Sequence, residues 1–222
     1  MSLEGEKEHM VSELFKRTVS AIILGAVVVL SILEGHWLFQ IFISVCTAMM
    51  LWEWVVMNNS HNKNAKMFLG GSCYIVVPML FWIYESRYSN VLQRDILWIF
   101  TIVWSCDVFA YFGGKLLGGP KLTPKISPKK TWSGVVVGSI FSFAASYVFL
   151  ITFFPSDKQL IIFSIPLIVA SILGDLIESK VKRILTVKDS GNLIPGHGGI
   201  LDRLDSFLLA TYVFMIFKIL FL

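Results

Sequence analysis

Charged residues are scarce in this 222-residue sequence: only 15% are Asp, Glu, Lys or Arg, whereas 55% are hydrophobic. The mean hydropathy is +0.72. A water-soluble globular protein needs more polar surface than this composition supplies. The apolar stretches are continuous rather than alternating, which argues against a β-barrel. The composition therefore predicts an all-α, polytopic integral membrane protein that forms one helical bundle.

Cysteine is also scarce, and none of the three residues belongs to a C-x-x-C spacing. Because Cys46, Cys73 and Cys106 each lie inside an apolar stretch, we interpret them as small buried hydrophobes. We expect neither a disulfide framework nor a zinc site. The first ten residues lack a basic n-region, so no cleavable signal peptide is expected.

Several sequence motifs that would name a chemistry are absent. The sequence contains no G-x-x-x-x-G-K-[ST], no G-x-S-x-G and no H-E-x-x-H. These absences exclude a P-loop, an α/β-hydrolase nucleophile elbow and an H-E-x-x-H zinc protease site. The net charge of +4 is small and follows from membrane topology, so we expect no nucleic acid as a partner.

Seven apolar stretches are each near the length that crosses a bilayer. They cover residues 18–35, 37–57, 68–84, 96–114, 133–154, 159–178 and 204–222. The third contains Pro78 and the sixth contains Pro166, and both prolines are tolerable in a span because neighbouring helices can satisfy the freed backbone groups. The sequence thus predicts about seven transmembrane helices.

Alternation of these spans sorts the basic residues onto two sides. One side receives fifteen of the 19 Lys and Arg residues and the other receives Arg87, Arg94 and Lys158. Lys218 lies near the end of the last span, where its side chain would snorkel to the interface. The positive-inside rule makes the richer side cytoplasmic, so we expect a cytoplasmic N-terminus. The two long loops, 115–132 and 179–203, both fall on that side.

The sixth and seventh spans contain paired carboxylates. Asp175 and Glu178 are three residues apart and share a helix face, and Asp202 and Asp205 open the next span. If the two helices pack side by side, Asp175 and Asp202 meet at one depth and form a hard-oxygen site suited to Mg²⁺. Glu178 and Asp205 are further candidate metal ligands.

A simpler interpretation is that these acids cap helices and pair with nearby Lys and Arg. For Asp202 and Asp205 alone we favour that interpretation. For Asp175, inside the apolar run ILGDLIES, we favour function, because acids at membrane depth are costly and tend to be functional. Glu53 and Asp107 are two more such acids, and Glu53 serves equally well as a structural hydrogen-bond anchor.

The loop 115–132 contains five lysines and no acid. The positive-inside rule is enough to explain Lys115 and Lys121. The segment 127–131, Ser-Pro-Lys-Lys-Thr, resembles a rigid turn that presents two cations and two hydroxyls to a phosphate or triphosphate. Asp107 and Tyr111 share a helix face that points toward this loop. The candidate substrate-binding residues here are Asp107, Tyr111, Lys115, Ser127, Lys129, Lys130 and Thr131.

Glycines surround His197 in the second loop. Gly198 and Gly199 allow the backbone to approach a ligand closely, although they would also simply form a turn. His197 by itself is weak support for any function.

Taken together, four segments resemble the signature of the phosphatidate cytidylyltransferases, also called CDP-diacylglycerol synthases. They are Ser179 to Arg183, Lys188-Asp189, Pro195 to Gly199, and Asp202 to Asp205. Upstream, Asp107 to Lys115 and Ser127 to Thr131 match a second block of the same family. The resemblance covers about residues 105–206, and departs from the family pattern at Ser133, where we expect Glu.

The resemblance implies transfer of a cytidylyl group from CTP to phosphatidate, with release of pyrophosphate and CDP-diacylglycerol. It maps the metal-binding carboxylates of the family onto Asp175 and Asp202. His197 is a better candidate for a phosphate contact than for proton abstraction, because the phosphatidate nucleophile is already an anion. The candidate catalytic residues are Asp175, Asp202, Lys182, Arg183, Lys188, Asp189, His197, Arg203 and Asp205.

The expected cofactor is Mg²⁺, with a second, monovalent ion such as K⁺ as an open alternative. The expected partners are CTP, phosphatidate and membrane lipids, with a homodimer as one possible assembly. We place the protein in a bacterial inner membrane with its active site on the cytoplasmic side. The chain divides into a cytoplasmic segment 1–17, N-terminal helices 18–95 and a catalytic region 96–222.

Two other functions stay open at this stage. One is a CTP-dependent lipid kinase that acts on a polyprenol-type alcohol and releases CDP instead of pyrophosphate. The other is an ion transporter in which Glu53, Asp107 and Asp175 line the path. The concentration of charge at one face and the lack of a visible inverted repeat argue against the transporter.

Overall fold

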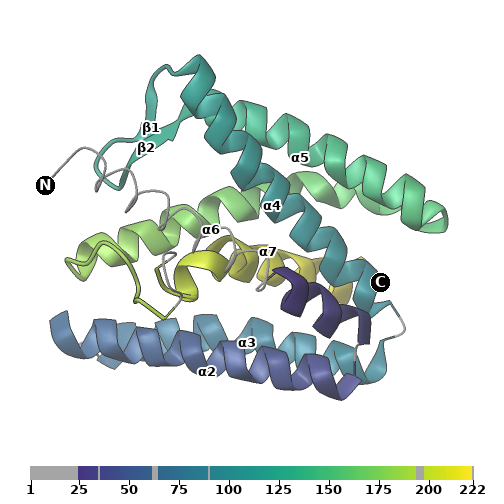
Figure 1. The fold of residues 1–222 in the computed structure, drawn as a ribbon, viewed down its shortest axis with the longest axis horizontal. Helices are drawn as coiled ribbons and strands as arrows, with labels where there is room; N and C mark the ends of the chain where they lie inside the picture. The colour runs from purple at the N-terminus through teal and green to yellow at the C-terminus, as the bar shows by residue number, and fades with distance from the viewer. Residues whose placement is uncertain (1–24, 35, 62–64, 90, 194–197, 222) are drawn as a thin grey trace, which may run out of the picture.

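The computed structural model describes residues 25–34, 36–61, 65–89, 91–193 and 198–221 (Figure 1). A short apolar helix, Gly25–Glu34, comes first. The elements that follow are α2 (His36–His61), α3 (Ala65–Tyr88), α4 (Leu92–Leu117), β1 (Lys121–Thr123), β2 (Ser127–Thr131), α5 (Trp132–Phe153), the 3₁₀ helix η1 (Pro155–Phe163), α6 (Ser164–Ile184) and α7 (Leu201–Phe221). The all-α membrane fold predicted from composition is confirmed, with one small hairpin added.

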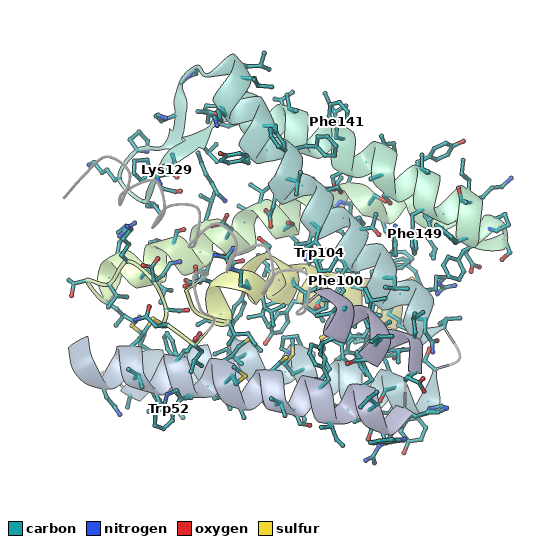
Figure 2. The ribbon with its side chains drawn as sticks, viewed as in Figure 1. Trp52, Phe100, Trp104, Lys129, Phe141 and Phe149 are labelled. Carbon is teal, nitrogen blue, oxygen red and sulfur yellow. The ribbon has the colours of Figure 1, made fainter. Side chains whose placement is uncertain are left out.

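Six described helices are long and apolar enough to cross a membrane. They correspond to the second through seventh predicted spans. The first predicted span, 18–35, lies partly outside the described residues, and its described part is the helix Gly25–Glu34. The predicted cytoplasmic segment 1–17 lies entirely outside them. Large apolar side chains face outward, as Trp52 does from α2 (Figure 2), because lipid rather than water surrounds these helices.

The prolines fit their helices for two different reasons. Pro78 lies inside α3, which continues through it to Tyr88. Pro166 lies in the first turn of α6, where the missing N–H would have no intrahelical partner in any case. Neither proline therefore ends a span.

Helix α7 lies in the middle of the bundle (Figure 1) and carries much of the aromatic core. Trp82 of α3 is fully buried and stacks on Phe214 of α7, with ring centroids 5.9 Å apart. Its indole N–H donates to Thr211 Oγ1 at 3.1 Å, so the polar atom of this large side chain is satisfied. These contacts lock α7 against α3.

Helices α4 and α5 approach closely because glycines line their contact. A Cβ atom on Gly138 would lie 2.8 Å from the Cys106 carbonyl oxygen, and one on Gly134 would lie 2.6 Å from the Ala110 carbonyl oxygen. Small residues at such contacts are the usual way for helices to pack in a membrane. The hairpin β1–β2 connects the two helices, and Lys121 of β1 pairs with Thr131 of β2.

The hairpin corrects one prediction. The segment 127–131 forms strand β2 instead of a rigid turn, and the turn lies at residues 124–126. Pro128 is compatible with this strand because the hairpin has only two strands, so each one has an unpaired edge.

A buried network of ion pairs lies at the end of the bundle opposite the hairpin. Arg94 lies 2.6 Å from Asp95 and 2.7 Å from Asp157. Lys218 pairs with Glu85 and lies 3.2 Å from Asp95. The sequence did not predict these partners of Lys218, and its snorkelling to the interface stays a prediction. The network ties α3, α4, η1 and α7 together.

We predict that Asp95→Ala strongly destabilises the protein. Asp95 is completely buried between Arg94 and Lys218, and its removal leaves two cations without this shared partner. Breaking a buried ion pair on one side costs about 3–5 kcal/mol. The measurement is the thermal unfolding midpoint of the purified protein in detergent. Lys158→Ala, on the exposed surface of η1, is the control. Equal midpoints for the two variants would show that the network contributes little.

Candidate active site

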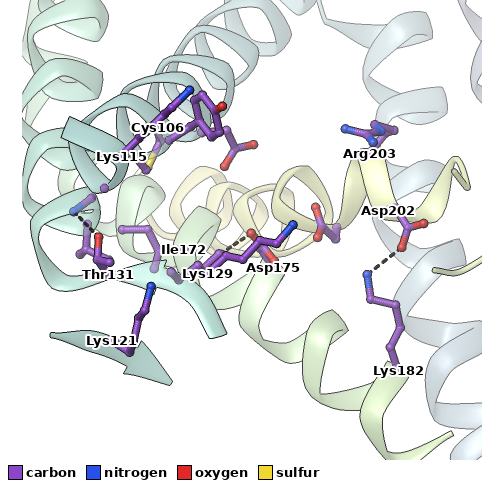
Figure 3. Close-up of a pocket in the computed structure, with 18 of the residues that line it drawn as sticks. Cys106, Lys115, Lys121, Lys129, Thr131, Ile172, Asp175, Lys182, Asp202 and Arg203 are labelled. Atoms are coloured by element: carbon purple, nitrogen blue, oxygen red, sulfur yellow. Dashed lines mark hydrogen bonds and ion pairs between the residues drawn. The ribbon is translucent and has the colours of Figure 1, made fainter. Parts of the chain in front are cut away.

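A pocket of about 690 Å³ opens at the hairpin end of the bundle (Figure 3). Side chains from the C-terminal half of α4, from the hairpin and the start of α5, and from α6 and α7 line it. Residues of the two long loops thus meet at one site, which is consistent with their predicted placement on the same side. The volume is in the range of small-molecule sites in proteins.

The hairpin contributes cations to the pocket. Lys121, Lys129, Lys130 and Thr131 line it, whereas Ser127 does not. Lys130 forms an ion pair with Asp175 of α6. Thr131 has a local role too, because its hydroxyl caps α5 by accepting the Gly134 N–H at 3.1 Å.

Lys121 is a residue that sequence reasoning undervalued. The positive-inside rule was enough to explain it, yet it lines the pocket. Its place follows from strand register, since Lys121 pairs with Thr131 across the hairpin. Recognition of the hairpin would have revealed this.

Helix α4 presents one polar face to the pocket. Asp107, Tyr111 and Lys115 are spaced four residues apart, and all three line it. The Lys115 amine lies 5.7 Å from the centroid of the Tyr111 ring, a cation–π distance. This face therefore offers an acid, an aromatic ring and a cation to a bound molecule.

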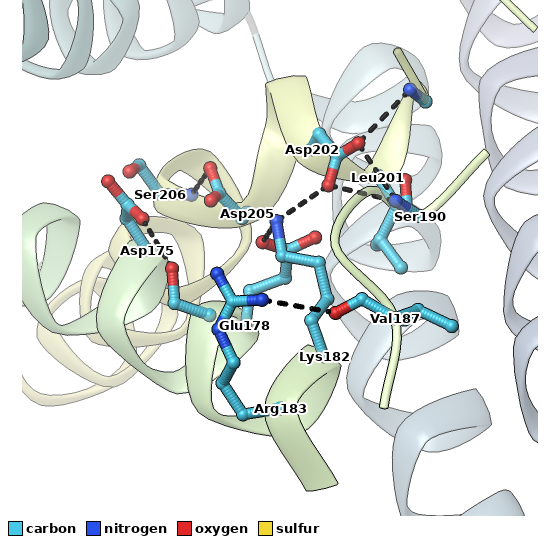
Figure 4. Close-up of polar contacts among 12 residues, drawn as sticks. Asp175, Glu178, Lys182, Arg183, Val187, Ser190, Leu201, Asp202, Asp205 and Ser206 are labelled. Atoms are coloured by element: carbon cyan, nitrogen blue, oxygen red, sulfur yellow. Dashed lines mark hydrogen bonds and ion pairs between the residues drawn. The ribbon is translucent and has the colours of Figure 1, made fainter. Parts of the chain in front are cut away.

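Helices α6 and α7 bring four carboxylates together because Gly174 lets them approach closely. A Cβ atom there would lie 2.7 Å from the Asp205 carbonyl oxygen. On α6, Glu178 lies 2.6 Å from the Lys182 amine, and that amine lies 2.7 Å from Asp202 of α7 (Figure 4). Lys182 thus neutralises one acid from each helix.

Asp202 is the most firmly held of these carboxylates. It accepts the Ser190 N–H at 3.0 Å and the Gly199 N–H at 3.1 Å in addition to its contact with Lys182. It lies in the first turn of α7, where the helix dipole favours negative charge. Asp175 instead contacts Lys130 and the Ser179 hydroxyl, the latter at 3.2 Å. Asp175 and Asp202 line the same pocket, but each has its own lysine.

The oxygen atoms of this site fit a hard divalent cation. Asp205 is buried and accepts the Ser206 N–H at 2.6 Å, and it has no ion pair with another described residue. The hydroxyls of Ser171 and Ser206 have no hydrogen-bond partner within the described ranges. No three acidic, His or Cys side chains there could enclose an ion by themselves. A Mg²⁺ ion would therefore need oxygen atoms from substrate or water, as it commonly does at phosphate sites.

Some predicted site residues lie elsewhere. Asp189 and Arg203 line the pocket, but Arg183 and Lys188 do not. The Arg183 guanidinium donates to the carbonyls of Ile126, at 3.3 Å, and Val187, at 3.4 Å. It therefore joins the hairpin turn to the loop after α6.

Gly198 and Gly199, the described glycines next to His197, do not line the pocket. Gly198 has a φ of 85°, which favours glycine, and a Cβ atom on Gly199 would lie 1.9 Å from Ser190 Oγ. These glycines make room for protein groups rather than for a ligand. His197 lies outside the described residues.

The acids of the proposed ion path separate into two places. Asp107 and Asp175 line the pocket, whereas Glu53 of α2 does not. Glu53 is buried and accepts hydrogen bonds from Ser190, Ile200 and Leu201. The structure thus gives Glu53 the role of a hydrogen-bond anchor, the simpler of its two interpretations.

The fold and the pocket define an integral membrane protein with a pocket lined by acids and cations at one end of its helical bundle. The chain belongs to the cytidylyltransferase family, whose model matches residues 15–94 and 73–221. It is 39% identical to a phosphatidate cytidylyltransferase of Rickettsia bellii, an alignment that covers 95% of each chain. It is 37% identical to the protein of the same name from Rickettsia prowazekii over 99% of each chain. A phosphatidate cytidylyltransferase of Brucella abortus is 43% identical over 57% of this chain and 47% of its own.

We predict that Gly174→Ala lowers stability, because its Cβ atom would meet backbone atoms of α7 that cannot move aside cheaply. Gly70→Ala is the matched control: Gly70 lies within helix α3, and a methyl group added there would have nothing within 4 Å. That change is expected to be neutral or to stabilise by up to about 1 kcal/mol through helix propensity. Thermal unfolding midpoints compare the two. An unchanged midpoint for Gly174→Ala would contradict the close helix contact.

Proposed function

We propose that this protein is a phosphatidate cytidylyltransferase, which transfers the cytidylyl group of CTP to phosphatidate and forms CDP-diacylglycerol and pyrophosphate. The observation that carries this proposal is the pocket in which lysines of the hairpin and acids of α6 and α7 meet at the end of lipid-facing helices. Relatives named for this activity align with nearly the full chain. A soluble nucleotide and a membrane lipid can both reach such a site.

The cations of the pocket suit the phosphates of both substrates. Lys121, Lys129 and Lys130 of the hairpin line the pocket together with Lys182 of α6 and Arg203 of α7. When an oxygen of phosphatidate attacks the α-phosphorus of CTP, negative charge develops on the pyrophosphate that leaves. Fixed cations stabilise this charge, and binding in one pocket aligns the reactants. No strong general base is needed, because the attacking oxygen is already anionic.

We further propose that the reaction depends on Mg²⁺, held by Asp175 and Asp202 with Glu178 and Asp205 as neighbouring ligands. Such an ion would neutralise phosphate charge and orient the triphosphate. Lys130 contacts Asp175 and Lys182 contacts Asp202, and these ion pairs hold the two carboxylates beside the pocket. A second, monovalent ion such as K⁺ stays a prediction.

An assay with purified protein, CTP and phosphatidate in vesicles tests the function directly. We expect pyrophosphate and CDP-diacylglycerol to form only when CTP, phosphatidate and Mg²⁺ are all present, and chelation of the metal to stop the reaction. Asp175→Asn and Asp202→Asn should each lower the rate about 100-fold or more, because each removes a carboxylate that is proposed to hold the Mg²⁺ beside the reacting phosphates. Glu34→Gln, on the exposed surface of the first described helix, is the matched control.

The products separate the alternatives. Formation of CDP and a lipid monophosphate would indicate a CTP-dependent lipid kinase instead. Full activity of the Asp175 and Asp202 variants would exclude the proposed metal site. Absence of any CTP turnover under these conditions would count against the transferase itself.

We propose that the pocket faces the cytoplasm of a bacterial cell from its inner membrane. The basic hairpin lies at the pocket end of the bundle, and the positive-inside rule assigns that end to the cytoplasm, where CTP is made (Figure 1). A homodimer, expected as one possible assembly, stays a prediction.

Membrane orientation can be measured by thiol labelling in a variant whose three natural cysteines are replaced. We expect Lys125→Cys, in the hairpin turn, to react with an impermeant maleimide only after the inner membrane is opened. Lys158→Cys, on exposed η1 near the opposite end, should react in intact spheroplasts. The reverse labelling pattern would refute the proposed orientation.

A further inference from the structure

Glu53 connects the N-terminal helices to the candidate active site without lining the pocket. It lies on α2, outside the region 96–222 to which the sequence assigned catalysis, and is only 2% exposed. Its carboxylate accepts the Ser190 hydroxyl at 3.0 Å, the Ile200 N–H at 3.0 Å and the Leu201 N–H at 2.9 Å. A buried carboxylate is stable only with such partners, and here they are Ser190 and two successive residues where α7 begins.

Ser190 links Glu53 to Asp202. Its hydroxyl donates to Glu53, whereas its backbone N–H donates to both carboxylate oxygens of Asp202, at 3.0 and 3.2 Å. Three successive backbone N–H groups also donate to one or the other of these two carboxylates. The Gly199 N–H donates to Asp202, and the N–H groups of Ile200 and Leu201 donate to Glu53. The two carboxylates therefore share the donors of Ser190 and of residues 199–201.

The packing around Glu53 leaves little freedom for movement. A Cβ atom on Gly191 would lie 2.8 Å from Glu53 Oε1, and one on Gly199 would lie 2.6 Å from Glu53 Oε2. The neighbouring Trp54 holds α2 in place, because its indole N–H donates to the Phe68 carbonyl at 3.0 Å. A Cβ atom on Gly71 would lie 2.2 Å from the Trp54 ring, so the ring fits against α3 only because residue 71 is glycine.

We propose that Glu53 is a positioning residue for the transfer reaction, which acts through Ser190 and the start of α7 to hold Asp202 toward the pocket. This inference rests on the proposed function. Glu53 touches neither substrate in this scheme. It orients a carboxylate that also contacts Lys182, so its loss would shift an acid and a cation of the site together. Residues that orient ligand-binding carboxylates in this way usually change affinity or activity when they are replaced.

Residue 53 must supply two acceptor oxygens, which a carboxylate does and an amide of the same shape does not. Oε1 accepts one backbone N–H, and Oε2 accepts another N–H and the Ser190 hydroxyl. In Glu53→Gln, either orientation of the amide points an NH₂ group at a backbone N–H, and two donors cannot bond each other. The size is conserved and the acceptor is lost, so this variant isolates the hydrogen bonds.

The experiment compares Glu53→Gln and Ser190→Ala with Thr211→Val. The last variant removes a buried hydrogen bond from the same helix α7, to Trp82, away from the pocket. For each purified full-length protein we would measure kcat, the KM for CTP and the Mg²⁺ concentration for half-maximal rate. Hydrogen exchange of the amides at residues 190 and 199–201 gives a readout independent of turnover.

We expect Glu53→Gln to lower kcat or raise the Mg²⁺ requirement about 10- to 100-fold. Exchange of the Ser190 and Gly199 amides, which bond Asp202, should also become faster. Ser190→Ala should show the same changes in weaker form, since Asp202 keeps its backbone donors. Thr211→Val should lower the unfolding midpoint alone. This pattern would support the positioning role of Glu53. A substitution that only weakened the fold would lower the unfolding midpoint without changing the Mg²⁺ requirement.

Wild-type kinetics and unchanged amide exchange in both Glu53→Gln and Ser190→Ala would overturn the inference, even with the transferase activity established. If Glu53→Gln does not fold, Ser190→Ala decides, because it leaves the buried carboxylate and its two backbone donors in place. A wild-type protein that turns over no CTP would defeat the proposed function instead. In that case the exchange rates still decide whether Glu53 holds the segment that bonds Asp202.

Discussion

The contact of Lys182 with Glu178 and Asp202 is the interaction on which the site depends. It joins α6 to α7 at the depth where the pocket opens, with distances of 2.6 and 2.7 Å. Carboxylates this close together repel one another unless a cation lies between them. Lys182 supplies that cation, and Lys130 does the same for Asp175 from the hairpin. These two lysines therefore allow the acids of α6 and α7 to lie close together at the pocket.

The membrane explains why charge gathers at two ends of this bundle. A charged group at the bilayer centre is expensive, so each one is paired or lies near an interface. The far end uses its charges for structure, since Arg94, Asp95 and Lys218 are buried against one another and their acidic neighbours. The pocket end keeps several cations exposed to a cavity, among them Lys121 and Lys129. The cost of charge inside lipid thus accounts for the buried ion network at one end and for the charged pocket at the other.

Much of this arrangement is readable from the sequence, for identifiable reasons. Long apolar runs predicted the six described spans, because only a helix satisfies every backbone group inside lipid. Helical spacing placed Asp107, Tyr111 and Lys115 on one face. Other features were not readable. Strand β2 was interpreted as a turn, since a short hairpin lacks a strong periodic pattern. The pairing of Lys218 with Glu85 was not predicted, because the two residues lie 133 positions apart in the sequence.

By itself, the sequence determined the fold class, the division of charge between two sides and the family, because these depend on composition, period and local spacing. Only the tertiary structure decided which groups meet. It gave Asp175 and Asp202 separate lysines, directed Arg183 to the hairpin turn and left it outside the pocket, and made Glu53 an anchor for the segment before α7. Such partners come from helices far apart in the chain. Their pairing depends on how closely helices approach at positions such as Gly174, and no local pattern encodes that distance.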